Sequence, residues 1–461
     1  MSELKASKYQ EYPEYKGSNI DWLDAIPEHW TTSKLRYTFS FGKGLTITKE
    51  NLGDTGIPCV NYGEVHSKYG FEVNPQKHPL KCVDEEYLKT SPYALLGNGD
   101  IVFADTSEDI DGSGNFTQLV SDEQIFAGYH TIIARPFDRE CSRFYAYLLD
   151  SKELRTQIRH AVKGVKVFSI TQAILRGVNI WLPPIDERTQ IANFLDHETA
   201  KIDTLIEKQQ QLIKLLKEKR QAVISHAVTK GLNPNAPMKD SGVEWLGEVP
   251  EHWDVKRNKH LMEFVTSGSR GWAEYYSDDG PLFFRITNLT RDTVEPKLES
   301  IQNVKPPAGS EGERSKIRSG DLLISITADL GSVCVADDSV VGGFVSQHVS
   351  LCRPNSLVIS SRWLAYFILS DAAKEQFIGS GYGGTKIQLS LEDIRELNIA
   401  YPPVSEQGEI ALYIDTKLEK FALLMNRAES QVNLLQERRT ALISAAVTGK
   451  IDVRNWEQPN D

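Results

Sequence analysis

The sequence contains few cysteines, and they show no metal-ligand spacing. Only five of the 461 residues are cysteine, an odd number scattered along the chain. Such a set gives neither a disulfide framework nor a zinc site and is typical of free thiols in a reducing compartment. The ten histidines form no His-Glu-x-x-His motif. We therefore expect no metal centre.

Long hydrophobic runs are also absent. No segment approaches the roughly 20 apolar residues that a membrane span needs. The first 17 residues, MSELKASKYQEYPEYKG, are polar and have no apolar core, so they do not resemble a signal peptide. We expect a cytoplasmic protein of two or more domains, because 461 residues exceed one ordinary core.

The sequence also lacks catalytic motifs. Two Pro-Pro pairs occur, in Leu182-Pro183-Pro184-Ile185 and Tyr401-Pro402-Pro403-Val404. Neither has the preceding Asn or Asp and the following aromatic residue of amino-methyltransferases, so we interpret both as boundaries between elements. We expect a non-catalytic chain without a cofactor of its own.

The formal net charge of −11 argues at first sight against nucleic acid as a partner. Net charge is a sum, however, whereas DNA interacts with a local patch within a Debye length of about 8–10 Å. The positions of the basic residues therefore matter more than their total.

The chain is a tandem duplication. Trp22-Leu23 and Pro27-Glu28-His29-Trp30 recur as Trp245-Leu246 and Pro250-Glu251-His252-Trp253. Asn179-Ile180, Ile191-Ala192 and the segment 222–229 recur 219 positions later. Chance matches would not keep one register over several blocks, so we expect two similar structural units.

Each copy begins with a mixed α+β part, about 20–182 and 243–401. Short β-branched and aromatic runs, such as 99–103 and 320–325, alternate with Gly and Pro. This texture predicts short strands and turns. Helices are expected to begin near Ser142 and Ser361.

Each copy ends with a long helical part, about 186–229 and 405–448. Gly408 is the only Gly or Pro in either segment. A seven-residue spacing predicts a coiled-coil seam; its members are Leu195, Ile202, Gln209, Leu216 and Val223 in the first copy, and Phe421, Ala428, Leu435 and Leu442 in the second. Leu205 and Leu212 are expected to supply a second seam. Each helix would run about 65 Å, and we expect the two to pack antiparallel rather than to pair with different proteins.

Three sets of motifs carry a resemblance to a known family. They are the helix entries Pro183-Pro184-Ile185-Asp186-Glu187-Arg188 and Pro402-Pro403-Val404-Ser405-Glu406-Gln407, the helix ends 219–225 and 438–444, and the two Trp-Leu…Pro-Glu-His-Trp segments. With the duplication, they resemble the specificity subunit of Type I restriction–modification systems over about 19–452. Arg188 departs from the usual Gln.

The resemblance implies a fold of two target-recognition domains joined by two antiparallel coiled-coil helices. It implies an N-terminal tail at 1–18, recognition domains at 19–184 and 236–403, and helical regions at 185–235 and 404–455. Each domain would read half of a bipartite site in double-stranded DNA, and the helices would set the spacer. Two methyltransferase subunits carrying S-adenosylmethionine would dock on the helices, and restriction subunits would complete the complex.

Residues 152–176 hold one acid, Glu153, and six basic residues: Lys152, Arg155, Arg159, Lys163, Lys166 and Arg176. If 151–163 is helical, the first four lie within about 80° on one face. Such a stripe could follow phosphates; a solvated helix face is the alternative. The second copy does not repeat the stripe, which indicates that the two domains grip DNA differently.

Further DNA-binding candidates lie in presumed loops. Two Gly-Lys segments, 163–166 and 381–386, could approach a backbone closely, and they contribute Lys163, Lys166, Thr385 and Lys386. Base reading needs Arg, Lys, Asn or Gln on exposed loops; the candidates are Lys43, Lys49, Asn61, Lys68, Arg270, Arg285, Asn288 and Arg291. For each, plain surface placement is the alternative.

An aromatic cluster in the second copy leaves two interpretations open. Trp272, Tyr275, Tyr276, Phe283 and Phe284 could stack on bases or form local packing. For the whole chain, the alternatives to a DNA-reading subunit are a single-chain restriction or methylation enzyme and a duplicated protein–protein adaptor.

Overall fold

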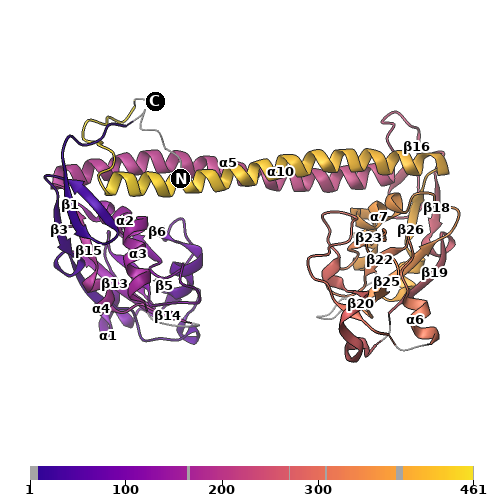
Figure 1. Ribbon diagram of the computed structural model, residues 1–461, viewed down its shortest axis with the longest axis horizontal. Coiled ribbons are helices and arrows are strands. Elements are labelled where there is room, and N and C mark those ends of the chain that lie inside the picture. Colours follow the sequence, from indigo (N-terminus) through magenta and orange to yellow (C-terminus); the bar gives the residue numbers. More distant parts are fainter. Residues whose placement is uncertain (1–8, 163–166, 269, 307–308, 380–387, 460–461) are drawn as a thin grey trace. The chain divides into compact units, whose positions relative to one another are not determined.

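The computed structural model describes residues 9–162, 167–268, 270–306, 309–379 and 388–459. The chain forms two compact units (Figure 1). Unit 1 comprises Met1–Gln209 with Ser430–Asp461, and unit 2 comprises Gln210–Glu429. Each unit therefore contains part of both long helices, α5 (Ile185–Lys230) and α10 (Val404–Val447).

Unit 1 is built around two sheets. The larger has the order β4 (Phe39–Lys43), β13 (Thr131–Pro136), β9 (Ile101–Ala104), β11 (Phe116–Leu119), β6 (Phe71–Val73). The smaller has the order β7 (Cys82–Val83), β5 (Ile57–Val60), β12 (Ile125–Ala127), β8 (Leu95–Leu96). Three antiparallel pairs join β1 (Tyr15–Ile20) to β2 (Leu23–Pro27), β3 (Thr31–Lys34) to β15 (Asn179–Leu182), and β10 (Thr106–Ser107) to β14 (Phe168–Ser169). The helices of unit 1, besides its parts of α5 and α10, are α1 (Tyr87–Thr90), α2 (Ser142–Asp150), α3 (Lys152–Ala161) and α4 (Gln172–Gly177). Its short helical turns are η1 (Leu35–Tyr37), η2 (Lys49–Asn51), η3 (Glu64–Lys68) and η4 (Pro92–Ala94).

Unit 2 repeats this plan. Its larger sheet has the order β19 (Met262–Ser267), β25 (Val349–Pro354), β22 (Leu322–Ser325), β23 (Val333–Val335). Its smaller sheet has the order β21 (Asn303–Val304), β20 (Tyr276–Phe284), β24 (Phe344–Val345). Strand pairs join β16 (Met238–Asp240) to β17 (Glu248–Pro250) and β18 (Asp254–Arg257) to β26 (Asn398–Tyr401). The helices are α6 (Ser310–Ser315), α7 (Ser361–Leu369), α8 (Asp371–Gly379) and α9 (Leu391–Glu396), with turns η5 (Asn258–His260), η6 (Trp272–Tyr275) and η7 (Ile286–Asn288).

The central strand of each larger sheet separates two hydrophobic cores. Ile101 and Phe103 of β9 face a core shared with α5 and α10, whereas Val102 and Ala104 face a core shared with β5 and β12. In unit 2, Leu322 of β22 faces the core shared with α5 and α10, and Leu323 faces the core that supports the smaller sheet. Alternate residues of a strand point to opposite faces, so a strand covered on both faces is continuously apolar. One core thus holds the helices, and the other supports the smaller sheet and its loops.

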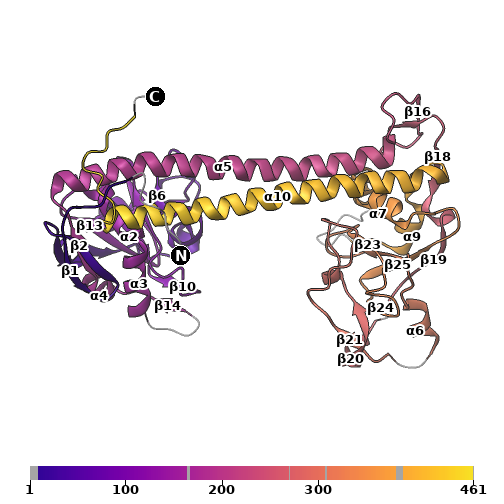
Figure 2. The same cartoon turned by 45° about the horizontal axis from the view of Figure 1, so that its top comes forward.

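The prediction of two long antiparallel helices is confirmed. In each unit the α5 and α10 segments lie side by side (Figures 1 and 2). The N-terminal part of α5 shares the unit 1 core with the C-terminal part of α10, including Leu195 and Leu442. The C-terminal part of α5 shares the unit 2 core with the N-terminal part of α10, including Val228 and Ile414. The helices expected at Ser142 and Ser361 are α2 and α7.

One part of the predicted coiled-coil pattern is wrong. Leu205 and Leu212 are 46% and 43% exposed. The second seam of α5 lies one residue later along the helix, at positions that are buried or half-buried: Thr199, Ile206, Ile213 and Arg220. A helical position moves by about 100° per residue, so a one-residue error turns a seam position onto an exposed flank.

A carboxylate, buried at Glu187 and half-buried at Glu406, fastens the start of each long helix to its unit. In unit 1, Trp30 Nε1 donates to Glu187 Oε1 (2.8 Å), and His29 Nε2 lies 2.7 Å from Glu187 Oε2. In unit 2, Trp253 Nε1 donates to Glu406 Oε2 (3.1 Å), and His252 Nε2 lies 2.7 Å from Glu406 Oε1. The two recurring motifs are therefore halves of one hydrogen-bonded unit.

In each unit the same tryptophan, Trp30 or Trp253, also packs against the end of the second long helix. Gly449, two residues beyond α10, has φ +74, and a Cβ there would lie 2.4 Å from Pro27 and 3.3 Å from the Trp30 ring. Gly231, directly after α5, has φ +75, and its Cβ would lie 3.2 Å from Trp253. Glycine tolerates both the left-handed backbone and the close approach.

Residues 9–18, expected within an N-terminal tail, are part of unit 1. Tyr12 is 3% exposed, and its hydroxyl donates to Glu187 Oε1 (2.5 Å). Burial and the neighbouring Glu187 carboxylate raise the pKa of Tyr12. The segment is ordered because this hydroxyl helps to satisfy a buried carboxylate.

Replacing Glu187 should destabilise unit 1. In Glu187→Ala, the buried Trp30 indole and Tyr12 hydroxyl lose their acceptor, at about 1–3 kcal/mol for each orphaned group. Glu187→Gln keeps an acceptor and should lose less. Urea unfolding followed by tryptophan fluorescence measures the difference, with the exposed Glu28→Ala as control. Equal stability of Glu187→Ala and Glu28→Ala would contradict this role.

Candidate nucleic-acid interface

Each unit carries a group of loops beyond its parallel strand pair. β5 and β12 pair with Phe126 opposite Cys59, and β20 and β24 pair with Phe344 opposite Phe283. Just beyond these strands, the backbone N–H of Gly128 donates to the Val60 carbonyl and that of Ser346 to the Phe284 carbonyl, both at 2.8 Å. The duplicated framework therefore places the following loops equivalently.

In each unit a third loop is joined to these loops by an equivalent backbone hydrogen bond. The N–H of Asp105 donates to the His130 carbonyl, and that of Ile326 donates to the His348 carbonyl, both at 3.1 Å. We name the resulting surfaces the loop edges. The loop edge of unit 1 comprises residues 61–68, 105–115 and 128–130, and that of unit 2 comprises 285–291, 326–332 and 346–348.

Side chains connect the loop edge of unit 1 to α3. His66 Nε2 lies 3.0 Å from Ser107 Oγ, and Asn115 Nδ2 donates to the His66 carbonyl (3.2 Å). Arg155 Nη1 then donates to Asn115 Oδ1 (3.0 Å). Segments far apart in sequence thus form one connected surface.

The candidate lysines of unit 1 are exposed, but Asn61 is not. Lys43 ends β4, Lys49 begins η2 and Lys68 ends η3, and all three side chains are exposed. Asn61 is 2% exposed, and its Nδ2 donates to the Cys59 carbonyl (3.3 Å). The expectation that Asn61 is on an exposed loop is wrong, because its carboxamide satisfies backbone inside the turn.

The basic stripe is largely paired with acids. Arg155 Nη2 lies 3.0 Å from Asp150 Oδ1, and the arginine side chain is 21% exposed. Arg159 donates to the Asp111 carbonyl (2.7 Å) and lies 3.2 Å from Asp111 Oδ1. Asp150 lies just before the segment 152–176, and the fold brings Asp111 from a distant loop, so counting acids within that segment missed both partners.

The remaining stripe residues do not extend the pattern. The helix ends at Ala161 rather than 163. Lys152 lies at its opposite end, where its backbone N–H donates to Ser444 Oγ of α10 (3.0 Å). Lys163 and Lys166 lie outside the described residues, as do Thr385 and Lys386 of the second Gly-Lys segment. Arg176 is exposed beside the Phe41 ring (5.7 Å).

The loop edge of unit 1 is also acidic. Burial, followed by the carboxylates of Glu108 and Asp109, raises the pKa of Tyr62. His130 Nδ1 lies 3.3 Å from Asp105 Oδ1. Carboxylates can accept hydrogen bonds from cytosine N4 but repel phosphates. This surface therefore presents acceptors as well as cations.

The loop edge of unit 2 contains more arginine. Arg270 is exposed just outside it. Arg285 Nη2 donates to Ser300 Oγ (3.1 Å), and Arg291 Nε donates to Asp329 Oδ1 (2.6 Å). Asn288 is fully buried, and its Nδ2 donates to two backbone carbonyls at 2.9 Å. Its expected exposure is wrong for the same reason as that of Asn61.

Sequence reasoning missed two residues on the loop edge of unit 2. Gln347 Nε2 lies 3.0 Å from His348 Nε2, and His348 is exposed. His130 occupies the equivalent position in unit 1. The two histidines are 218 positions apart, one less than the main repeat offset, so an alignment allowing single-residue gaps would have matched them.

The aromatic cluster of unit 2 is mostly packed. Trp272 and Phe283 are 3% and 4% exposed and stack at 5.9 Å, whereas Tyr276 is 42% exposed. Phe284 is fully buried in a neighbouring core. Local packing therefore accounts for most of the cluster but leaves the Tyr276 ring accessible.

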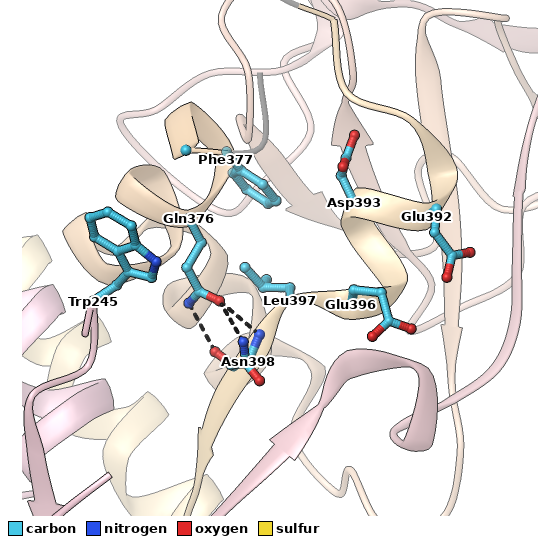
Figure 3. Close-up of a pocket in the computed structure, with 9 residues that line it drawn as sticks. Trp245, Gln376, Phe377, Glu392, Asp393, Glu396, Leu397 and Asn398 are labelled. Atoms are coloured by element: carbon cyan, nitrogen blue, oxygen red, sulfur yellow. Dashed lines mark hydrogen bonds between the residues drawn. The ribbon is translucent and has the colours of Figure 1, made fainter. Parts of the chain in front are cut away.

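A separate pocket of about 290 Å³ in unit 2 belongs to the duplicated framework (Figure 3). Trp245 forms one wall, and Gln376 exchanges two hydrogen bonds with the Asn398 backbone (2.9 and 3.0 Å). Gly379 corresponds to His160 of unit 1, whose ring lies 5.2 Å from Trp22. The pocket thus exists because Gly379 lacks the ring present in the other copy.

Neither a metal-ligand cluster nor a disulfide occurs among the described residues. These residues contain no group of three or more His, Cys, Asp or Glu residues that could hold a metal ion. All five cysteines are free, and burial raises the pKa of the Cys59, Cys141 and Cys352 thiols to about 12. None of the helices in the described ranges is long and apolar enough to cross a membrane.

Comparisons with known proteins agree with this geometry. The family model of the Type I restriction modification DNA specificity domain matches residues 27–215 and 250–433. The Type I restriction enzyme EcoKI specificity subunit of Escherichia coli K12 is 24% identical, covering 94% of this chain and 92% of the relative. The EcoBI specificity subunit of Escherichia coli is 21% identical, covering 96% and 90%.

Solved structures share the fold. A chain from "Structural basis underlying complex assembly and conformational transition of the type I R-M system" matches with a TM-score of 0.68 and 18% identity, covering 92% of this chain and 99% of the other. The HsdS subunit of Thermoanaerobacter tengcongensis matches with a TM-score of 0.50 and 17% identity, covering 92% and 98%.

Replacing Arg159 should loosen the loop at 105–115. Arg159→Ala removes both contacts with Asp111, so amides of this loop should exchange hydrogen faster, because local opening becomes less costly. Hydrogen-exchange mass spectrometry measures the change. Arg176→Ala, which removes an equal charge from α4, should leave the loop unaffected. Unchanged protection in Arg159→Ala would show that the contacts do not hold the loop.

Proposed function

The chain belongs to the Type I restriction–modification DNA specificity family, and we propose that each unit reads one half of a bipartite site in double-stranded DNA. One observation carries the proposal: the two units share a framework down to single backbone hydrogen bonds but differ in the chemistry of their loop edges. Because the frameworks match, both units present their loop edges in the same way. Because the side chains on those edges differ, the two units would read different base sequences.

The difference between the loop edges supports two distinct half-sites. Unit 1 presents Lys68 and the acids of loop 105–111, whereas unit 2 presents Arg285 and the Gln347–His348 pair. Arginine favours guanine, glutamine favours adenine, and carboxylates favour the cytosine amino group. An adaptor that binds the same protein twice would not need this divergence.

In this proposal, the lengths of α5 and α10 set the spacing between the two half-sites. α5 has 46 residues and α10 has 44, and each continues without interruption from one unit into the other. A helix advances about 1.5 Å per residue, so its length fixes how much chain separates the two reading modules. The unread spacer of the DNA site follows from this length.

Exposed leucines support the docking of two copies of one partner. Unit 1 exposes Leu205 of α5 (46%) and Leu434 of α10 (55%). Unit 2 exposes their repeat equivalents, Leu424 of α10 (46%) and Leu215 of α5 (60%). Exposed apolar groups recurring in equivalent positions are typical of interfaces.

We assign these leucines to the methyltransferase subunits. Those subunits would bind S-adenosylmethionine and modify the DNA that this chain selects, and restriction subunits would join the assembly. This chain contributes sequence recognition and a scaffold, and no catalytic group of its own.

Exchange of one recognition domain tests the division of labour. Replacing residues 20–182 by the corresponding segment of another specificity subunit should change one half-site, because unit 2 retains its loop edge. Methylation mapping of cells that express the chain with its methyltransferase reports both halves. A matched exchange of 243–401 should change the other half. If either exchange altered both halves, the assignment of one half-site to each unit would fail.

Charged substitutions should remove one methyltransferase copy at a time. Leu205→Glu with Leu434→Glu should reduce the assembly from two copies to one, since each carboxylate would be buried without a partner. Leu424→Glu with Leu215→Glu should have the same effect through unit 2. Native mass spectrometry counts the subunits. Leu232→Glu, beyond the end of α5, is the control, and retention of both copies by the two double variants would exclude this docking face.

A further inference from the structure

The loop edge of unit 2 contains a pocket of about 230 Å³. Its walls include the rings of Trp272, Tyr276 and Phe283, and its rim includes Arg285 and His348. Pockets for drug-sized ligands usually measure roughly 300–1,000 Å³. This one is smaller and suits a flat group of one or two rings.

Two polar atoms in the pocket lining have no hydrogen-bond partner among the described residues. Ser346 is 4% exposed, and its Oγ is buried and unpaired. Arg285 Nε is also buried and unpaired, although Nη2 of the same side chain bonds Ser300. An unpaired buried polar group destabilises the folded protein. A ligand with a polar edge would remove this destabilisation at both atoms.

The concave shape of the pocket favours one of two ways of reading DNA. A base pair in the major groove is read by side chains that protrude toward it. A concave pocket needs the opposite arrangement, in which a group protrudes from the DNA. An unstacked base does so: it is flat, aromatic and edged with donors and acceptors.

We propose that one nucleobase of the half-site read by unit 2 leaves the stack and enters this pocket. The inference rests on the proposed function and adds a specific mode of reading to it. Tyr276, which is 42% exposed, offers aromatic surface for stacking, and the buried Phe283 ring lies 5.5 Å behind it. Ser346 Oγ and the Arg285 guanidinium bind the polar edge of the base.

The equivalent place in unit 1 is occupied by protein. Gly128 stands where unit 2 has Ser346, and a Cβ on Gly128 would lie 1.8 Å from Asn61 Oδ1. Asn61 therefore occupies the space that a side chain at this position would need, and Cys59 replaces the Phe283 ring. The base-binding pocket is thus a feature of unit 2, and unit 1 reads its half-site without it.

Fluorescence of 2-aminopurine tests the proposal. The full chain, assembled with its methyltransferase, is bound to duplexes carrying the mapped site with 2-aminopurine at one position after another. Fluorescence should rise several-fold at one position of the unit 2 half-site. Tyr276→Ala and Arg285→Ala should abolish that rise, and loss of one stacked base should weaken binding about 5- to 150-fold. Tyr276→Phe, which keeps the ring, should restore both.

The controls separate this inference from the proposed function. Arg318→Ala removes an exposed arginine of unit 2 outside the pocket and should change nothing. A rise that persists in Tyr276→Ala and Arg285→Ala belongs to the methyltransferase and overturns the pocket assignment, as does the absence of any rise in the unit 2 half-site. If the wild-type assembly showed no preference for the site, the proposed function itself would fail. Circular dichroism verifies the fold of each variant.

Discussion

The structure depends on a carboxylate at the start of each long helix, buried in unit 1 and half-buried in unit 2. Glu187 and Glu406 accept hydrogen bonds from the indoles of Trp30 and Trp253, and these rings also pack beneath the glycines that follow the opposite helix ends. A second carboxylate nine residues further along α5, that of Asp196, accepts hydrogen bonds from Arg143 and Tyr147 at 2.7 Å. A carboxylate that is removed from water without a hydrogen-bond donor is costly. Each helix can therefore join its unit only at the position where its carboxylates meet these donors.

The sequence was sufficient for the architecture because duplication and helical periodicity are patterns within the chain. Two copies in register identified the paired units, and freedom from Gly and Pro identified α5 and α10. The prediction of the second seam failed because these helices carry leucines on their exposed flanks as well as in the seam. Only the partner helix decides between them, and Leu205 lies on the exposed flank.

The candidate site was harder to predict because polar side chains have two uses. Asn61 and Asn288 resemble base readers in a list of residues, yet both complete backbone hydrogen bonds inside turns. Arg155 and Arg159 resemble phosphate ligands until the fold brings Asp150 and Asp111 beside them. Asp111 is 48 residues from Arg159, so local composition does not contain that pair, whereas Asp150 lies just before the basic segment 152–176. The seven-residue patterns, by contrast, are local.

Unit 2 is continuous in sequence, whereas unit 1 is closed by the last 32 residues, Ser430–Asp461. During synthesis, all of the residues of unit 2 are translated before residues 430–461. Unit 1 waits for this later segment, because its core includes Leu442 and Val447. Domains generally fold as units as they emerge. Unit 2 can then finish folding before unit 1, and a chain that stops before residue 430 contains all of unit 2 but lacks the segment that closes unit 1.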